Sequence, residues 1–318
     1  MIPTTVSKIS ISDKSTTLKV RFAVFCRQNL IQTLFLLLSV AVSFHAKAQY
    51  QSLCWQISGN GLKHPAYLYG TMHVTDPRVF NLGDKANKAF AESKVYAMEL
   101  DPAKAMSMTT LAKMIMGDGN KISKLIPDSD YHFLDSIVRL SSGYGMSMFN
   151  TMEPIIVSAI LDEYGMGIST KDSSNMKDAL DFYLGKKAKE QKKKVIGIET
   201  VDEQISALHA LSYQEQALLL IESIQEVKKG KKNADVDLMQ YYLAQNLDSL
   251  LTLGDENQMP PKLYKAMVTD RNIKMAERIA IFMHKQPTFI AVGALHLPGP
   301  GGVIALLRKM GYTVEPWR

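Results

Sequence analysis

The sequence has little of what several simple structural classes require. Its 318 residues include only 19 Gly and 12 Pro, which excludes collagen-like and low-complexity architectures. An apolar fraction of 46% is too high for a disordered chain, and 21% of charged residues is too many for a protein with several membrane spans. We therefore expect a globular protein with an ordinary hydrophobic core.

Most of the chain has no excess of basic over acidic side chains. The formal charge is +6, but the first 48 residues carry six basic side chains against one acidic side chain. The rest of the chain holds 31 basic and 30 acidic side chains. A body so close to neutrality gives no electrostatic reason to expect nucleic acid, either DNA or RNA, as a partner.

The basic N-terminus leads into an apolar run that is typical of an export signal. Residues 30–44 read LIQTLFLLLSVAVSF, which is shorter than the roughly 20 residues of a membrane span. Ala46-Lys47-Ala48 then provides a small-x-small cleavage pattern. We expect residues 1–48 to be a secretory signal peptide and residues 49–318 to be an exported protein, periplasmic or secreted, with no membrane span after cleavage. An uncleaved anchor is the alternative.

Several familiar sites are excluded by absences. The predicted cleavage leaves Cys54 as the one remaining cysteine, so an internal disulfide and a Cys-rich zinc site are both excluded. The motifs G-x-x-x-x-G-K-[ST], G-x-G-x-x-G, G-x-S-x-G and H-E-x-x-H do not occur. Nucleotide-binding sites, α/β-hydrolases and zincin proteases that carry these standard motifs are therefore excluded.

Six short apolar runs rich in β-forming residues predict strands. They are residues 53–57, 67–69, 95–100, 195–198, 289–292 and 312–314. Helical patterns lie between most of them, which favours an α/β fold with a mostly parallel central sheet flanked by helices. Gly59-Asn60-Gly61 reads as a hairpin turn, so we expect an antiparallel hairpin at one edge. Residues 102–191 and 200–285 predict a large helical insertion, with one apolar stripe from Ile205 through Leu218 to Ile224.

Two G-x-x-H segments each follow a predicted strand. Residues 70–73 read GTMH and residues 293–296 read GALH. A third copy at residues 61–64 lies in a turn and follows no strand, so we treat it as coincidence. The repetition at two strand ends, more than 200 residues apart, indicates that His73 and His296 belong to one site.

Two further predicted strands end in a glutamate, namely Glu99 and Glu199. Ligands of open α/β sheets bind at the carboxyl ends of the strands, so parallel neighbours would bring these glutamates to the two histidines. Imidazoles with carboxylates suit a divalent transition metal, and a second glutamate could act as general base. Asp101 lies on the same side of its strand as Glu99 and is assigned to substrate binding.

Arg271 interrupts the apolar stripe of a helix expected over residues 265–284. An arginine on a buried face needs a carboxylate, and a glutamate of the site is an obvious partner. Alternatively, Arg271 would stabilise an oxyanion. Asn272 faces the same apolar side and is assigned to substrate binding.

Each of these residues also has a purely structural interpretation. A histidine at a strand end can simply be hydrogen-bonded in a loop, and the glutamates can pair with Arg271 without any chemistry. The Gly/Pro segment at residues 297–302 either makes a tight turn or holds an anion. The many methionines favour a malleable core or an adaptable peptide groove over a copper site.

Together these segments resemble the TraB/GumN family, which is related to the Tiki metalloproteases and more distantly to haem-binding ChaN-like proteins. The matching pieces are residues 67–73 (YLYGTMH), 98–101 (MELD), 198–204 (IETVDEQ), 271–272 (RN) and 293–317 (GALHLPGPGGVIALLRKMGYTVEPW). The resemblance implies a divalent metal, Mn, Co or Zn. Its implied ligands are His73, His296, Glu99 and Glu199. Its implied catalytic residues are Glu99, Glu199 and Arg271.

The same resemblance implies a reaction. We expect an exported metal-dependent hydrolase that acts on a peptide or protein substrate. The metal would polarise the carbonyl and acidify water, a glutamate would shuttle the proton, and Arg271 would orient a carboxylate or stabilise the oxyanion. Which glutamate is ligand and which is base stays open. The alternative is an envelope protein that binds a peptide, a metal or haem without chemistry.

Overall fold

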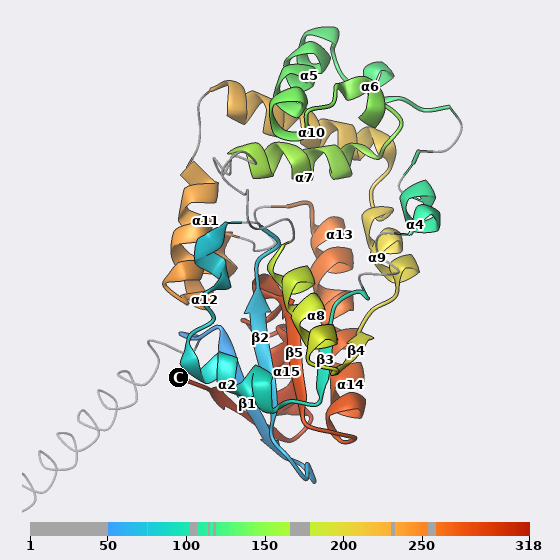
Figure 1. Cartoon of the computed structure of the whole chain (residues 1–318). Coiled ribbons are helices and arrows are strands. Elements are labelled where there is room, and N and C mark those ends of the chain that lie inside the picture. Colours follow the sequence, from blue (N-terminus) through green and yellow to red (C-terminus); the bar gives the residue numbers. More distant parts are fainter. Residues whose placement is uncertain are drawn as a thin grey trace, which may run out of the picture. The chain divides into compact units, whose positions relative to one another are not determined.

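A six-stranded sheet in the order β4-β3-β5-β2-β1-β6 organises the described part of the chain (Figure 1). The structure, a computed structural model, describes residues 50–318 except 75, 102–106, 114, 117–118, 166–178, 230–232 and 254–258. The strands are β1 (Cys54–Gly59), β2 (Ala66–Thr71), β3 (Val95–Met98), β4 (Lys194–Gly197), β5 (Thr288–Gly293) and β6 (Tyr312–Pro316). Each falls on a predicted apolar run.

Neighbouring strands β4, β3, β5 and β2 are all parallel. β1 is antiparallel to β2, and β6 is antiparallel to β1. The mostly parallel α/β sheet predicted from the sequence is therefore confirmed. Four parallel neighbours place four carboxyl ends along the same edge of the sheet.

The Gly59-Asn60-Gly61 turn joins β1 to β2 as predicted, with positive φ at all three residues. The expected antiparallel edge is confirmed, and it extends one strand beyond the hairpin. β6 pairs with the free side of β1, so that β6 is the edge strand. The last strand thereby satisfies backbone groups that β1 would otherwise expose.

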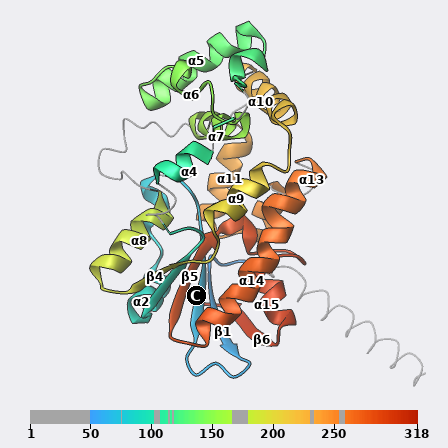
Figure 2. The ribbon, with the colours of Figure 1, turned by 90° about the vertical axis from the view of Figure 1, so that its right-hand side faces the viewer.

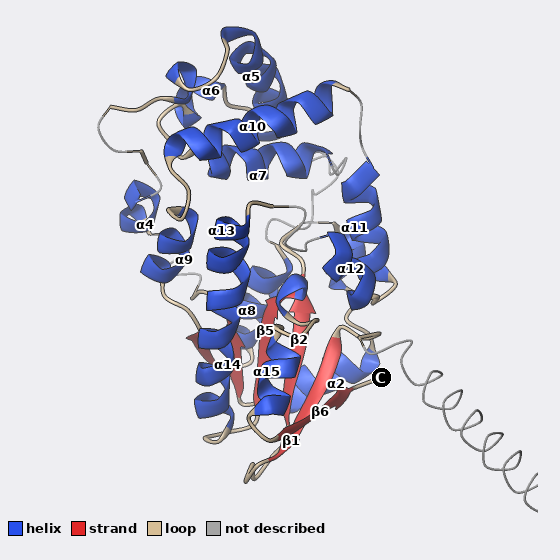
Figure 3. Ribbon diagram, turned by 180° about the vertical axis from the view of Figure 1, so that it is seen from behind, coloured by secondary structure: helices blue, strands red, loops and turns tan. Residues whose placement is uncertain are grey.

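Helices cover both faces of the sheet (Figure 2). α2 (Asp84–Glu92) and α8 (Leu180–Glu190) pack on one face, and Phe90 of α2 lies edge-on against Tyr96 and Phe289. α14 (Asp270–Met283) and α15 (Val303–Lys309) lie on the other face (Figure 3). Since both faces are covered, β2 and β5 are almost wholly buried and consist mainly of apolar residues.

The remaining helices come from two separate stretches of sequence. The first stretch contributes α4 (Met108–Lys113), α5 (Asp128–Ser142), α6 (Met146–Phe149) and α7 (Pro154–Gly165). The second contributes α9 (Val201–Leu208), α10 (Tyr213–Lys228), α11 (Asn233–Leu243), α12 (Leu247–Leu253) and α13 (Pro261–Tyr264). Residues of α5, α7 and α10 form a second hydrophobic cluster, so the predicted helical insertion is confirmed.

The single apolar stripe predicted from Ile205 to Ile224 is wrong. Ser212 caps α10 through a reciprocal hydrogen-bond pair with Glu215, which starts a new helix between α9 and α10. The helical period restarts there, so Leu218 is 62% exposed while Ile224 is buried.

The expected signal peptide, residues 1–48, lies outside the described residues. Within the part of the chain that the structure describes, no helix combines the length and the apolar character that a membrane crossing needs.

The corner between β4 and α9 is fixed by charged side chains. Thr200 and Glu203 cap α9 reciprocally. Arg278 of α14 donates to both carboxylate oxygens of Glu203, at 2.7 Å each, and to the carbonyl oxygen of Ile198 at 2.8 Å. These bonds hold the segment that carries Glu199 against α14.

Glu203 provides a test of this corner. Hydrogen bonds from Arg278 lower the pKa of Glu203 to about 2 in the folded protein, against roughly 4.3 for an unfolded glutamate. The unfolded chain therefore takes up the proton first, and the stabilisation is complete above about pH 4.3 and lost as the pH falls toward 2. We expect Glu203→Gln to lower the urea midpoint at pH 7 and to have progressively less effect at pH 4 and pH 3. In an Arg278→Met background the pH-dependent difference should become much smaller, because only the hydrogen bonds from Thr200 then lower the pKa of Glu203. An unchanged difference in that background would contradict this account.

Candidate functional site

The carboxyl ends of the parallel strands bring the predicted residues to one edge of the sheet. Glu99 directly follows β3, and His73 follows β2 by two residues. His296 closes η4 (Ala294–His296), the short 3-10 turn after β5. β2 and β5 end in register, because Thr71 pairs with Gly293. Residues more than 200 positions apart in the sequence thus become neighbours.

The convergence is clearest around Gly293. A Cβ atom at Gly293 would lie 3.2 Å from Oε1 of Glu99, 3.4 Å from Cδ2 of His296 and 3.9 Å from Nε2 of His73. Three of the predicted residues therefore surround one point that a side chain at position 293 would fill. Only glycine leaves this space open.

These residues line a cavity of about 330 Å³. Its polar lining includes His73, Glu99, Arg271 and His296. Glu199, Asn272 and Asp101 do not line it, although all three lie within the described residues. The structure thus brings four predicted residues to one cavity and places the other three behind or beside it.

Arg271 connects the two glutamates. Its Nε and Nη2 donate to the two carboxylate oxygens of Glu199 at 2.9 and 2.6 Å, and Nη2 also donates to Oε2 of Glu99 at 2.8 Å. Nη1 donates to the carbonyl oxygen of Met267, in the π-helical turn η3 (Lys265–Thr269) that precedes α14. All three side chains are buried. The prediction that Arg271 pairs with a glutamate of the site is confirmed, and it pairs with both.

The charges at the cavity follow from this network. Burial alone would raise the pKa of Glu99, but the positive charges of His296, in its protonated form at acidic pH, and of Arg271 outweigh burial and hold that pKa well below the usual range. Burial lowers the pKa of His296 to about 4. His296 is therefore neutral at pH 7, and Arg271 is the cation that keeps Glu99 ionised there.

Asn272 sets the tautomer of His296. Its side-chain amide donates to the carbonyl oxygen of Gly301 at 2.9 Å, so its Oδ1 faces the imidazole. Nδ1 of His296 lies 2.7 Å from that oxygen and must carry the proton. The lone pair of Nε2 is left on the side of Glu99, whose Oε1 is 3.9 Å away. A neutral imidazole with its other nitrogen anchored is the usual form of a metal-ligating histidine.

The assignment of Asn272 and Asp101 to substrate binding stays a prediction. Both polar groups of Asn272 are bonded within the protein, and the residue is 2% exposed, so these contacts make it a positioning residue for His296. Asp101 is half-buried beside the β3–β4 end of the sheet, where its backbone nitrogen lies close to Gly197.

His73 stands at the open side of the cavity, with 53% of its side chain exposed. Its Nδ1 lies 3.4 Å from Oδ2 of Asp181 in α8. The other oxygen of Asp181 and the hydroxyl of Thr71 are buried without a hydrogen-bond partner. Burial raises the pKa of Asp181, and His73 partly offsets this effect. Sequence reasoning missed Asp181, although a carboxylate inside the apolar stretch 179–184 is a detectable signal.

Gln204 was also missed. From the first turns of α9 its amide donates to Oε2 of Glu199 at 3.0 Å and to Oε2 of Glu99 at 3.4 Å. It therefore satisfies carboxylate oxygens that Arg271 alone does not saturate. The reciprocal cap of Thr200 and Glu203 starts α9, but nothing local in the sequence indicates where Gln204 points.

The donor atoms fit a divalent metal in kind. Among the residues that the structure describes, no group of three His, Cys, Asp or Glu side chains is close enough, as placed, to hold an ion. However, Nε2 of His296 and Oε1 of Glu99 are 3.9 Å apart, near the roughly 3.3 Å that separates two ligands of one tetrahedral ion. Two imidazole nitrogens and a carboxylate oxygen match the preferences of Mn, Co and Zn.

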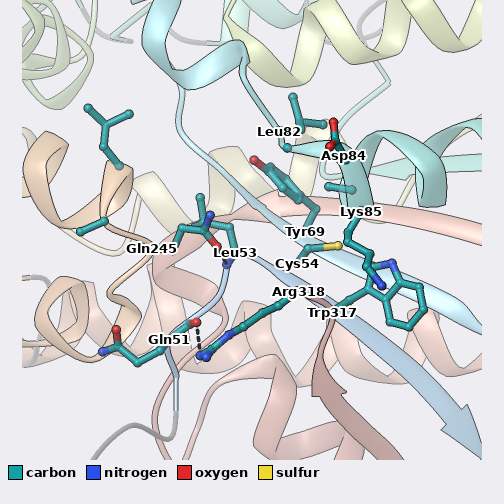
Figure 4. A pocket seen from close by; sticks show the side chains of 14 residues that line it. Gln51, Leu53, Cys54, Tyr69, Leu82, Asp84, Lys85, Gln245, Trp317 and Arg318 are labelled. Carbon is teal, nitrogen blue, oxygen red and sulfur yellow. Dashed lines mark hydrogen bonds between the residues drawn. The ribbon is translucent and has the colours of Figure 1, made fainter.

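A second cavity is larger, about 530 Å³, but carries different chemistry (Figure 4). Its walls include Cys54, Tyr69, Lys85, Trp317 and Arg318, and contain neither a histidine nor any predicted site residue. Burial raises the pKa of Cys54 to about 12, so this thiol is neutral. The smaller cavity is therefore the candidate site.

Comparison with known proteins agrees with this site. A model of the TraB/PrgY/gumN family matches residues 53–316. The chain belongs to the TraB/PrgY/gumN family. The resemblance seen in the sequence is thus confirmed over nearly all of the described residues, including both G-x-x-H segments. No solved structure matches this family member.

Curated relatives of this TraB/PrgY/gumN protein carry the name metalloprotease. Metalloprotease TIKI1 of Danio rerio is 25% identical over 85% of this chain and 64% of its own length. Metalloprotease TIKI2 of Xenopus tropicalis is 25% identical over 79% of this chain and 57% of its own. Metalloprotease TIKI1 of Homo sapiens is 23% identical over 85% of this chain and 62% of its own length. The chain is therefore similar to metalloproteases and spans about 57–64% of these relatives' lengths.

Arg271 provides a test of the buried network. We expect Arg271→Met to lower the free energy of unfolding by about 3–5 kcal/mol, because it leaves two buried carboxylates without their cation. Adding Glu99→Gln and Glu199→Gln to that variant should recover part of the loss. Arg139→Met removes an exposed arginine that pairs with Asp135 and should change stability by less than about 1 kcal/mol. Equal effects of Arg271→Met and Arg139→Met in urea unfolding would contradict the network.

Proposed function

We propose that this chain is an exported metal-dependent hydrolase that cleaves peptide bonds. The observation that carries the proposal is the convergence of His73, Glu99 and His296 around the open space at Gly293. Arg271 lines the same cavity. The relatives named metalloproteases support the same reaction class.

The residues that would hold the metal are His296 and His73, each through Nε2, and Glu99 through Oε1. A divalent ion bound there would polarise a substrate carbonyl and make a water molecule more acidic. Asn272 keeps Nε2 of His296 unprotonated, and Asp181 supports His73 from the opposite side. Both arrangements orient an imidazole toward the cavity before any substrate arrives.

The two glutamates have different surroundings, which separates their roles. Both oxygens of each glutamate accept hydrogen bonds: Oε1 of Glu99 accepts from the backbone N–H of Gly293 at 2.6 Å, and Oε2 accepts from Arg271 at 2.8 Å. Only Glu99 lines the cavity, whereas Glu199 lies behind it and is held by Arg271 and Gln204. We infer that Glu99 acts on the reaction, as ligand or as general base, and that Glu199 is a positioning residue that holds Arg271. Arg271 keeps its charge at the cavity wall, where it can orient a substrate carboxylate or stabilise an oxyanion.

Export is part of the proposal and rests on residues 1–48. Their basic start, apolar run and Ala46-Lys47-Ala48 pattern favour cleavage after Ala48. We expect N-terminal sequencing of the protein recovered outside the cytoplasm to begin at Gln49. A mature protein that retains Met1 would contradict the predicted cleavage.

Metal-dependent peptidase activity is the main test. The chain is stripped with EDTA, reloaded with Mn, Co or Zn, and incubated with a mixed peptide library while bound metal is measured by mass spectrometry. We expect cleavage only after reloading, and a loss of at least about 100-fold in His73→Ala and in His296→Ala. Glu99→Gln should lose metal if Glu99 is a ligand, or retain metal and lose cleavage if it is the base.

His64→Ala is the matched control, because His64 ends the third G-x-x-H copy and is exposed in the β1–β2 turn. It should cleave like the unmodified chain. Full cleavage by both His73→Ala and His296→Ala would overturn the metal-site interpretation. Bound metal or bound peptide without any cleavage would instead support the sequestering protein considered from the sequence.

A further inference from the structure

The lining of the candidate cavity is of two chemical kinds. Part of it is polar and consists of Thr71, His73, Glu99, Arg271 and His296. A further part, the apolar half of the lining, consists of Met72, Val74, Leu238, Tyr242, Leu250 and Leu295. A molecule that fills the cavity therefore meets ionised and polar groups together with a large apolar surface.

The apolar half is built into the fold. Tyr242 and Leu250 are 2% and 1% exposed, and Val74 is 3% exposed. The hydroxyl of Tyr242 donates to the carbonyl oxygen of Gly70 at 3.0 Å, so the polar atom of this side chain is already used. Apart from Tyr242, these residues have no side-chain group that hydrogen-bonds strongly, and a charged group placed against them would lose its hydration without compensation.

The apolar half is also attached to both G-x-x-H segments. The Tyr242 bond to Gly70 ties α11 to the first segment. Leu295 belongs to the second segment and lies between Gly293 and His296 in the sequence. α12, which carries Leu250, packs against η4. A group held by α11 and α12 is therefore held next to the metal donors and not at a distant subsite.

We propose that this pocket receives a large apolar side chain, such as Leu, Met or Phe, that flanks the scissile amide of the peptide substrate. The inference rests on the proposed peptidase function and names its substrate class. A cavity of about 330 Å³, shared with the reacting amide, has room for one such side chain. Met72, which is half-buried and flexible, can adapt the wall to aliphatic or aromatic shapes.

Matched peptides test the preference. After mass spectrometry has located the cleaved bond in the library, the flanking residue is changed among Leu, Ala, Lys and Asp in an otherwise constant peptide. We expect kcat/KM for the Leu peptide to exceed that for the Ala peptide by about 10- to 100-fold on one side of the bond. The Asp and Lys peptides should be cleaved more slowly still.

Two variants of one helix separate specificity from folding. Leu238 of α11 is half-buried and lines the pocket, whereas Leu243 of the same helix is 39% exposed and does not line it. Leu238→Asp should lower kcat/KM for the Leu peptide about 10-fold and raise it for the Lys peptide. Leu243→Asp should leave the ratio of the two peptides unchanged. A folding defect would lower kcat/KM for both peptides together and could not reverse the preference between them.

The outcomes distinguish this inference from the function on which it rests. Metal-dependent cleavage with equal rates for Leu and Asp peptides would overturn the apolar pocket and leave the peptidase standing. Absence of cleavage for every peptide would overturn the peptidase. In that case fluorescence anisotropy with the same labelled peptides decides on the pocket, because equal affinities for Leu and Asp peptides would overturn it as well.

Discussion

The site depends on burying one guanidinium between two carboxylates. Ions taken out of water lose several kcal/mol of hydration each, so such a cluster is tolerated only when nearly every donor and acceptor is matched. Arg271 meets this requirement with Glu199, Glu99 and the Met267 carbonyl oxygen, and Gln204 fills remaining oxygen positions. The cluster fastens α14 to the ends of β3 and β4. It also carries one more negative than positive charge, which favours a cation at the cavity.

The parallel sheet brings residues that are far apart in the sequence together in this cluster. Because β4, β3, β5 and β2 run in the same direction, any residue just past their ends reaches the same edge. Recognising apolar strands followed by His or Glu was therefore sufficient to predict that Glu99, His73 and His296 meet. It could not predict that Arg271 would stand between the glutamates, since that depends on where α14 crosses the sheet.

Most of what the sequence did not predict depends on long-range packing, and one error comes from a local helix cap. The G-N-G turn is a local signal and was interpreted correctly, whereas the pairing of β6 with β1 joins the two ends of the described chain and leaves no local trace. The stripe through Leu218 failed because the cap at Ser212 restarts the helical period. Asp181 and Gln204 were missed because their relevance lies in the partners they meet, His73 and the two glutamates, and not in their own neighbours in sequence.

The glycines of the two G-x-x-H segments explain why the motif has its form. Neither Gly70 nor Gly293 has a positive φ, so a turn conformation does not require them. A Cβ at Gly70 would lie 2.9 Å from Leu297 and 3.1 Å from Ala294, where β2 approaches the turn that carries His296. A Cβ at Gly293 would occupy the point that the metal donors surround. Gly70 allows the two segments to approach each other, and Gly293 leaves room between their histidines. Both positions therefore require glycine because a side chain would not fit, and not because of an unusual backbone conformation.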